Sequence, residues 1–402
     1  MRDEGPDARA TQVVPFRFPP PNSRYDGRVS FANLRALCGQ LLSVGFDGPQ
    51  APAELLARIA RSEVGGVMLF RPNIVEPAQV AELVRSLRKA SPAGFPLAVS
   101  VDQEGGLVQR LRQPLTVWPD MFSVAAAGDP ARTLAVGRGL GDELAALGIG
   151  WNFAPVLDVH TNPANPVIGN RAFGATPAAV QVHALAFWRG LRAAGVLGCG
   201  KHFPGHGDTK TDSHLVLPVV VHDESRLRAV ELAPFAAAVA AGLSAIMTAH
   251  VLYPVWDARL PATLSRRIAR EILREDLGFS GLLVSDDLGM RAVADRWPIE
   301  ELVVQSLLAG VDHFLVREPQ ARQEAAFAAL VRAAETQPEV RARVQESAAR
   351  TARFKALLSP RMPADKAELL ARLGTPEHQA LAASFPRVDA TAATGSPVVD
   401  SY

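Results

Sequence analysis

The chain is poor in cysteine, because its 402 residues include only Cys38 and Cys199. Two cysteines cannot form the set of disulfides that holds many small secreted proteins together, and they are too few for a zinc site built on cysteines. The sequence therefore indicates a protein of a reducing compartment, and we expect it to be cytoplasmic.

Neither sign of charge dominates the sequence. Lys and Arg number 42 and Asp and Glu number 41, which gives a formal net charge of +1. This balance gives no electrostatic reason to expect nucleic acid or an anionic membrane as a partner. Hydrophobic residues make up 48% of the chain and charged residues 21%, which is typical of a soluble globular protein with a large core.

The sequence also lacks an uninterrupted apolar segment of membrane length. One stretch, Leu232 to Trp256, carries no Asp, Glu, Lys or Arg and is long enough to span a bilayer. Proline and glycine interrupt it, so we predict a helix over 235–241 and a buried strand over 244–250 instead. Residues 1–30 contain no apolar core after a basic start, and we expect an N-terminal arm there rather than a secretory signal.

Short apolar runs recur along the rest of the chain, with helical patterns between them. The runs do not alternate apolar and polar residues, as expected for strands buried on both faces, and strands that alternate with helices favour a parallel sheet. Eight such runs predict an α/β protein with a single (β/α)₈ TIM-like barrel over 31–360, followed by a C-terminal helix and a disordered tail over 361–402. The predicted strands cover 40–46, 64–70, 97–102, 150–157, 196–202, 245–250, 281–285 and 311–316, and the clearest helices cover 78–89, 176–194, 265–277 and 298–308.

Polar side chains gather where four of the predicted strands end. In parallel α/β proteins the C-terminal ends of the strands form the active-site face. Ordinary turn chemistry explains one or two such residues, so four strands that deliver them to one rim indicate a functional site. The residues are Asp102, Lys201, His202, His250, Asp286 and Asp287.

The richest segment is KHFPGHGDTKTDSH, residues 201–214, with three histidines, two aspartates and two lysines. His202 and His206 have the spacing of a helical zinc pair, but the proline and glycines argue against a helix, which leaves a metal site on a loop as an alternative. Asp212 and His214 lie two residues apart and can face the same way on an extended loop. A carboxylate beside an imidazole orients the ring and raises its pKa, which favours an acid/base pair over a purely structural histidine.

Two adjacent carboxylates, Asp286 and Asp287, follow the predicted strand at 281–285 and should point in different directions. One can enter a pocket while the other caps the following helix; the alternative is that both act as caps. A pocket carboxylate that faces an Asp–His pair suits displacement at an acetal carbon. The carboxylate attacks, the histidine protonates the leaving oxygen, and water completes the second step.

Seven segments, taken in order, resemble glycoside hydrolase family 3, in its β-N-acetylhexosaminidase (NagZ-like) branch. The resemblance covers roughly residues 36–320. The segments read GQLLSVGFDG, VDQEGG, APVLDV, IGNRAFG, KHFPGHGD with DSH, IMTAHVLYP and SDDLGM.

This resemblance implies a (β/α)₈-like barrel and hydrolysis that retains configuration through a covalent glycosyl-enzyme. It implies that Asp286 is the nucleophile and that His214, paired with Asp212, is the acid/base, in keeping with a side chain that titrates near neutral pH. It implies neither a metal nor another cofactor. The sugar contacts of the branch fall on Asp102, Arg110, Arg171, Lys201 and His202.

The implied function is that of a monomeric exo-β-N-acetylglucosaminidase acting on GlcNAc-containing saccharides such as peptidoglycan-derived muropeptides, without a nucleic-acid or membrane partner. Several alternatives keep the barrel. With phosphate as acceptor the same intermediate gives a sugar phosphate, a β-glucosidase or β-xylosidase takes another sugar, and a silent sugar-binding protein shows no turnover. A metal-dependent barrel hydrolase is a further alternative.

Two features depart from the family pattern. Leu107 stands where members commonly have an arginine after VDQEGG. We expect the loss of that arginine to change either a contact of this loop or the region that binds the aglycone. Only 86 residues follow Val316, too few for the second α/β domain of many β-glucosidases in the family. We therefore expect the barrel alone to build the site.

Overall fold

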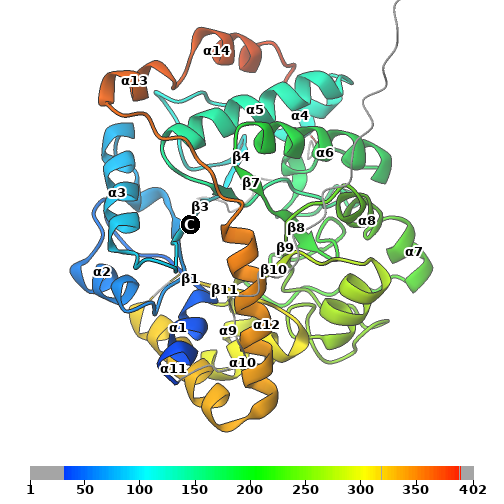
Figure 1. Cartoon of the computed structure of the whole chain (residues 1–402). Coiled ribbons are helices and arrows are strands. Elements are labelled where there is room, and N and C mark those ends of the chain that lie inside the picture. The colour runs from blue at the N-terminus through cyan, green and yellow to red at the C-terminus, as the bar shows by residue number, and fades with distance from the viewer. Residues whose placement is uncertain (1–30, 318, 389, 391–402) are drawn as a thin grey trace, which may run out of the picture.

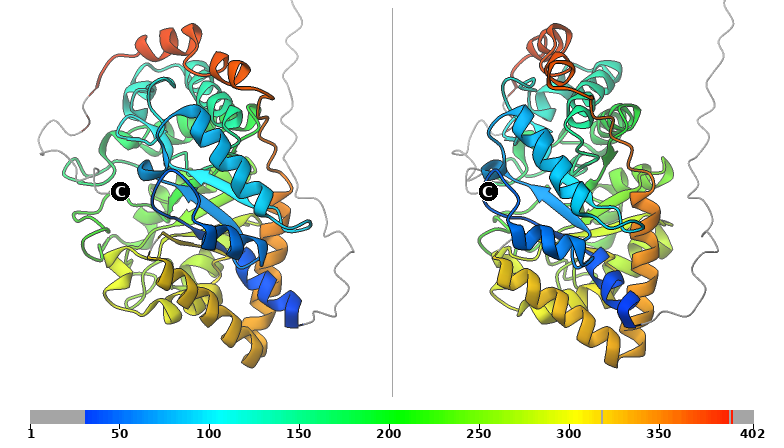
Figure 2. Two further views of the ribbon diagram at one scale, coloured as in Figure 1. Left: turned by 90° about the vertical axis from the view of Figure 1, so that its left-hand side faces the viewer. Right: turned by 60° about the vertical axis from the view of Figure 1, so that its left-hand side comes forward.

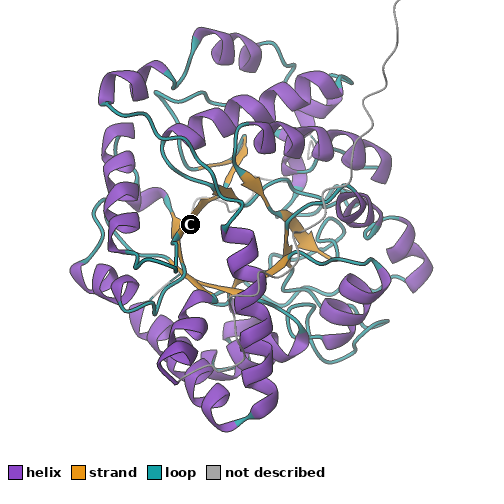
Figure 3. Cartoon of the chain, in the orientation of Figure 1, coloured by secondary structure: helices purple, strands orange, loops and turns teal. Residues whose placement is uncertain are grey.

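The structure is a computed structural model, which describes residues 31–317, 319–388 and 390. The arm predicted over 1–30 and the tail residues 391–402 lie outside the described residues. A ring of strands occupies the centre of the molecule and helices surround it (Figures 1 and 3).

The ring is one parallel sheet with the order β7-β6-β3-β2-β1-β11-β10-β9-β8. β7 and β8 are separated by Cys199 alone, so the two ends of this order belong to one interrupted strand and the sheet closes into a barrel of eight strand positions. The predicted (β/α)₈ barrel is confirmed, and each predicted strand overlaps an observed one. The strands are β1 Leu42–Val44, β2 Gly66–Leu69, β3 Ala98–Val101, β6 Trp151–Asn152, β7 Leu197–Gly198, β8 Gly200–Phe203, β9 Ala245–Thr248, β10 Leu282–Asp287 and β11 His313–Val316; β4 Gln103–Gly105 and β5 Val108–Gln109 form a separate antiparallel hairpin.

Helices follow the strands around the barrel, and the five helices predicted by range coincide with α3, α6, α8, η3 and α10. Among the helices in the described part of the chain, none combines the length and the hydropathy needed to cross a membrane. Their bounds are α1 Phe31–Gln40, α2 Ala53–Ala60, η1 Arg71–Asn73, α3 Pro77–Ala90, α4 Met121–Ala126, α5 Pro130–Ala146, η2 Gly169–Arg171, α6 Pro177–Ala193, α7 Glu224–Ala229, α8 Ala233–Ala240, η3 Arg267–Asp276, α9 Arg291–Ala294, α10 Ile299–Ala309, α11 Gln320–Thr336, α12 Pro338–Lys355, α13 Lys366–Ala371 and α14 Pro376–Ala383.

Large side chains fill one end of the barrel. The ring of Phe354, from α12, lies 4.8 Å from the ring of Trp151 at the start of β6. The next residue, Lys355, donates from Nζ to Gln40 Oε1 at 2.7 Å and to the carbonyl of Gly65 at 2.6 Å, just before β1 and β2. Because α12 closes the N-terminal ends of the strands, a ligand can reach the barrel axis from the C-terminal ends.

The two helices that follow α12 lie on the outside of the barrel. After α12 the chain passes α13, which packs against α3, and then α14, which packs against α5 (Figures 1 and 2). Glu143 of α5 accepts the backbone N–H of Gly374 at 2.9 Å, and the ring of His378 lies beside Trp118. These contacts bring the chain toward the loops at the C-terminal ends of the strands.

Candidate active site

One pocket opens at the C-terminal ends of the strands. Apolar side chains from the strands, among them Met68, Met247 and Leu315, line it together with charged groups from the loops. All eight residues to which the resemblance assigns a catalytic or sugar-binding role line this pocket: Asp102, Arg110, Arg171, Lys201, His202, Asp212, His214 and Asp286.

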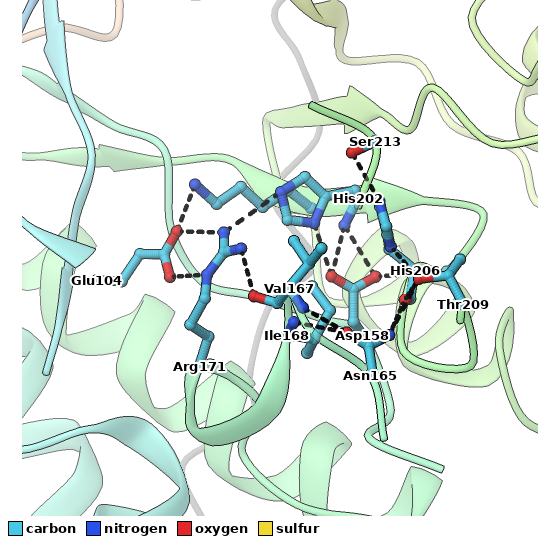
Figure 4. Close-up of polar contacts among 12 residues, drawn as sticks. Glu104, Asp158, Asn165, Val167, Ile168, Arg171, His202, His206, Thr209 and Ser213 are labelled. Carbon is cyan, nitrogen blue, oxygen red and sulfur yellow. Dashed lines mark hydrogen bonds and ion pairs between the residues drawn. The ribbon is translucent and has the colours of Figure 1, made fainter. Parts of the chain in front are cut away.

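Glu104, which the sequence analysis did not single out, lies at the centre of the charges. Its carboxylate holds Arg171 by two bonds, from Nε to Oε2 and from NH2 to Oε1, both 2.9 Å (Figure 4). The Nζ of Lys201 lies 2.6 Å from Glu104 Oε1 and 2.8 Å from Asp102 Oδ1, and Arg110 lies 3.7 Å from the other oxygen of Asp102. Two carboxylates and three cations therefore form one ordered array.

The array keeps both members of its buried ion pairs charged. Burial alone raises the pKa of Glu104, but the charges of Arg171 and Lys201 outweigh it and hold that pKa well below the ordinary value. Burial lowers the pKa of Lys201, and Asp102 with Glu104 raises it above the ordinary lysine value. At neutral pH Lys201 and Arg171 are thus fixed cations that can donate hydrogen bonds into the pocket.

We predict that Glu104→Gln lowers the free energy of unfolding at neutral pH by about 3–5 kcal/mol, because it leaves buried cations without their partner in a site where Glu104 is 2% exposed. Glu104 has a depressed pKa when folded, so its stabilising effect is fully present above the unfolded pKa of ~4.3. The effect is lost as the pH falls below that value toward the folded pKa. Urea unfolding between pH 7 and pH 3 measures both effects. A variant as stable as the wild type, with the same pH slope, would contradict this.

Asp158, buried and also missed by the sequence analysis, orders the segment after β8. Its Oδ2 lies 2.7 Å from Nδ1 of His202, and its carboxylate accepts the backbone N–H groups of His202 and His206 (Figure 4). Because Nδ1–H of His202 donates to Asp158, its Nε2 is directed to the side of Arg171, 3.5 Å from NH2. Asp158 therefore fixes both the position and the tautomer of the His202 ring.

His206 holds the loop that follows it. Burial and the nearby charge of His202 lower its pKa to about 4, so the ring is neutral at pH 7. Its two nitrogens lie 2.9 Å from Thr209 Oγ1 and 3.0 Å from Ser213 Oγ. Over the described ranges, no three or more His, Cys, Asp or Glu side chains are grouped so that they could hold a metal ion.

His214 and Asp212 form the pair that their spacing predicts. Asp212 Oδ1 accepts the backbone N–H of His214 at 2.8 Å and lies 2.5 Å from its ring Nδ1. Burial raises the pKa of Asp212, but these bonds from His214 outweigh it, so the net shift is downward. An ionised Asp212 fixes Nδ1 as the donor and leaves Nε2, on the other side of the ring, as the atom that can exchange a proton.

Asp286 and Asp287 have different surroundings, although they are adjacent. Asp287 Oδ1 accepts the backbone N–H groups of Gly289 at 2.9 Å and of Arg317 at 3.1 Å, so it caps a turn rather than the following helix α9. Burial raises its pKa. Burial also raises the pKa of Asp286, but three histidines, with His202 the strongest, lower it below the ordinary value overall. The two pKa values thus shift in opposite directions, and Asp286 is the carboxylate whose ionised form its surroundings favour.

His250, which lies two residues after the end of β9, is a structural residue. It is buried, its Nε2 donates to the carbonyl of Asp287 at 3.0 Å, and its Nδ1 lies 2.8 Å from Thr263 Oγ1. It is not among the residues that line the pocket. Its role is to support the turn that carries Asp286 and Asp287.

Comparison with known proteins agrees with this geometry. Residues 33–354 match the model of the glycosyl hydrolase family 3 N-terminal domain, which covers the barrel from α1 to α12. The chain belongs to glycosyl hydrolase family 3. The match ends before α13, so α13, α14 and the residues after them lie outside the family domain.

Individual relatives extend the comparison. Beta-hexosaminidase A of Pseudoalteromonas piscicida is 36% identical over 408 aligned residues, which cover 94% of this chain and 67% of that protein. A family 3 β-N-acetylglucosaminidase structure from Paenibacillus sp. str. FPU-7 has a TM-score of 0.79 and 40% identity, covering 87% of this chain and 67% of that one. NagZ of Neisseria gonorrhoeae, solved with N-trifluoroacetyl-D-glucosamine, has a TM-score of 0.71 and 32% identity, covering 86% and 96%.

Proposed function

We propose that this family 3 enzyme is a retaining exo-β-N-acetylglucosaminidase that removes terminal GlcNAc. The observation that carries the proposal is that an ionised carboxylate, Asp286, and the Asp212–His214 pair line the same pocket as an array of fixed charges. The names of the relatives, a β-hexosaminidase and a β-N-acetylglucosaminidase, support the choice of sugar.

The reaction follows from these groups. Asp286 attacks the anomeric carbon and the bond from that carbon to the leaving oxygen breaks. His214, which starts this step protonated on both ring nitrogens, gives its Nε2 proton to the leaving oxygen and becomes a neutral imidazole. In the second step His214 takes a proton from water, the water oxygen bonds to the anomeric carbon, and the Asp286 carboxylate leaves. Two displacements on opposite faces retain the configuration. Asp212 stabilises the imidazolium form of His214, which is present before the first proton transfer and forms again in the second.

The charge array binds the sugar in this scheme. Asp102 accepts from two hydroxyls, while Lys201, Arg110 and Arg171 donate to hydroxyls or to the acetamido oxygen. Asp158 keeps His202 in one tautomer at the same sugar. None of these contacts requires a metal or a cofactor.

A comparison of aryl β-N-acetylglucosaminide with aryl β-glucoside, with and without phosphate, tests the proposal. We expect turnover of the acetamido sugar and free GlcNAc as product in both buffers. Preference for the glucoside would contradict the choice of sugar, and sugar 1-phosphate as the main product would identify a phosphorylase. Tight GlcNAc binding without turnover would identify a sugar-binding protein, and loss of turnover in EDTA would identify a metal-dependent hydrolase.

We predict that the acid limb of kcat/KM lies below pH ~4. Protonation of Asp286 removes the nucleophile, and the neighbouring histidines hold the pKa of Asp286 below that of an ordinary aspartate, ~3.9. Activity should therefore persist at pH 4.5 wherever circular dichroism shows a folded protein. An acid limb near pH 6 in a folded enzyme would show that Asp286 is not the group whose ionisation controls the first step.

We further propose a cytoplasmic enzyme that acts as a monomer on fragments such as muropeptides, with residues 31–360 as the catalytic unit. Cys38 and Cys199 are buried and unpaired, which suits a reducing compartment.

A further inference from the structure

The chain after α14 returns to the rim of the pocket. We call residues 384–388 with Ala390 the C-terminal strap. Its start is held on α5, where Arg132 NH2 donates to the Oγ of Ser384 at 2.6 Å and the guanidinium lies 4.3 Å from the ring centre of Phe385. The strap lies beyond residue 354, where the match to the family domain ends.

The far end of the strap is bound by one side chain of η2. Asn170 donates from Nδ2 to the carbonyl of Val388 at 2.8 Å, and its Oδ1 accepts the backbone N–H of Ala390 at 2.8 Å. The N–H of Val388 donates to Ser123 Oγ at 2.9 Å, which joins the strap to α4 as well. Because the amide of Asn170 bonds to the strap backbone through both its nitrogen and its oxygen, it holds the strap in one register.

Between its two anchors the strap is separated from the barrel loops by a groove of about 1010 Å³. The groove is lined from the barrel side by Leu107, Val117 and Ile168, and from the strap side by Phe385, Arg387 and Val388. Phe385 is buried in the hydrophobic core and secures the start of the strap, while the hydrogen bonds of Asn170 and Ser123 fix its far end to the rim.

The same short helix carries a pocket residue. Arg171 follows Asn170 directly, and its guanidinium reaches Glu104 and the carbonyl of Val167, 3.0 Å from NH1. Asn165 holds the start of this turn by accepting the N–H groups of Val167 and Ile168. The start of the turn is thus held from within the barrel, and its end is held by the strap.

We propose that the C-terminal strap, acting through Asn170, positions Arg171 and thereby sets the affinity of the pocket for its sugar. The inference rests on the proposed function, in which Arg171 contacts GlcNAc. Asn170 is a positioning residue here, because it touches the strap and not the substrate.

The test uses three variants of the full chain: Asn170→Ala, a chain that ends at Arg387 and so lacks Val388 and Ala390, and the two changes combined. A chain that ends at Thr394 is the matched control, since it keeps every strap bond described above. We measure kcat and KM on an aryl β-N-acetylglucosaminide and the Kd of free GlcNAc by calorimetry. Melting temperatures show whether the variants are folded.

We expect Asn170→Ala and the chain ending at Arg387 each to raise KM and Kd about 5- to 30-fold, with kcat within about threefold. The double change should be no worse than the truncation alone, because the truncation already removes both bonds of Asn170 together with the bond from Val388 to Ser123. The control should match the wild type. Lower melting temperatures with unchanged KM and Kd, or additive effects in the double variant, would overturn the inference and leave the proposed function intact. A wild type that neither cleaves the glycoside nor binds GlcNAc would overturn both.

Discussion

Asp286→Asn should lower kcat on every β-N-acetylglucosaminide by about 10⁴- to 10⁶-fold, the range seen when a covalent nucleophile is removed. The neighbouring histidines hold the pKa of Asp286 below its ordinary value, so the carboxylate is ionised and nucleophilic at neutral pH. The amide has nearly the same shape but cannot form the glycosyl ester. Steady-state kinetics on an aryl glycoside measures the loss.

Asp287→Asn is the matched control. It changes a buried aspartate on the same turn, yet the amide oxygen can still accept from the backbone N–H groups of Gly289 and Arg317. Because these two bonds that hold the turn are kept, we expect less than a ~10-fold fall in kcat. Equal losses in the two variants would show that the turn, rather than the Asp286 carboxylate, is what turnover requires.

His214→Ala should slow turnover by about 10²- to 10⁴-fold on substrates with poor leaving groups, the usual range for general acid–base catalysis. A nitrophenolate leaves without a proton, so such activated substrates should lose far less in their glycosylation step. Asp212→Asn should show the same trend more weakly, because it keeps the ring but removes the negative charge that supports its protonated form.

A series of aryl glycosides with increasing leaving-group pKa separates these expectations. In the wild type kcat/KM should depend weakly on that pKa, and in His214→Ala it should fall steeply as the pKa rises. His206→Ala is a useful comparison, since it removes a neutral histidine that binds Thr209 and Ser213 on the same loop. It should lower all rates together. Parallel lines for wild type and His214→Ala would refute the assigned role.

Local pattern alone predicts most of the barrel. The eight apolar runs lack alternation because each strand is buried on both faces, and that signal needs no long-range contact. β6 is shorter than its predicted range of 150–157, since Pro155 has no N–H to give to a sheet ladder. The sequence analysis expected one helix after 360, whereas α13 and α14 occupy that region. These short helices depend on packing against α3 and α5, which composition does not reveal.

The residues of the site likewise fall into those that local sequence motifs predict and those that only distant contacts reveal. The site residues predicted from recognisable motifs line one pocket. Glu104 and Asp158 were missed, although they lie in the quoted segments VDQEGG and APVLDV. Their importance comes from partners far along the chain, Arg171 for Glu104 and His202 for Asp158. The strap was missed for the same reason, because the partner of Asn170 is backbone more than 200 residues away and carries no sequence signal.

Trapping the glycosyl-enzyme tests the central claim most directly. A 5-fluoro-β-N-acetylglucosaminyl fluoride should form the ester quickly and release it slowly, so the intact protein should gain the mass of one fluorosugar. Peptide mapping should place that mass on Asp286, and Asp286→Asn should not be labelled. A label on another residue, or turnover of this reagent with no protein adduct under conditions that trap an ester, would contradict a covalent mechanism through Asp286.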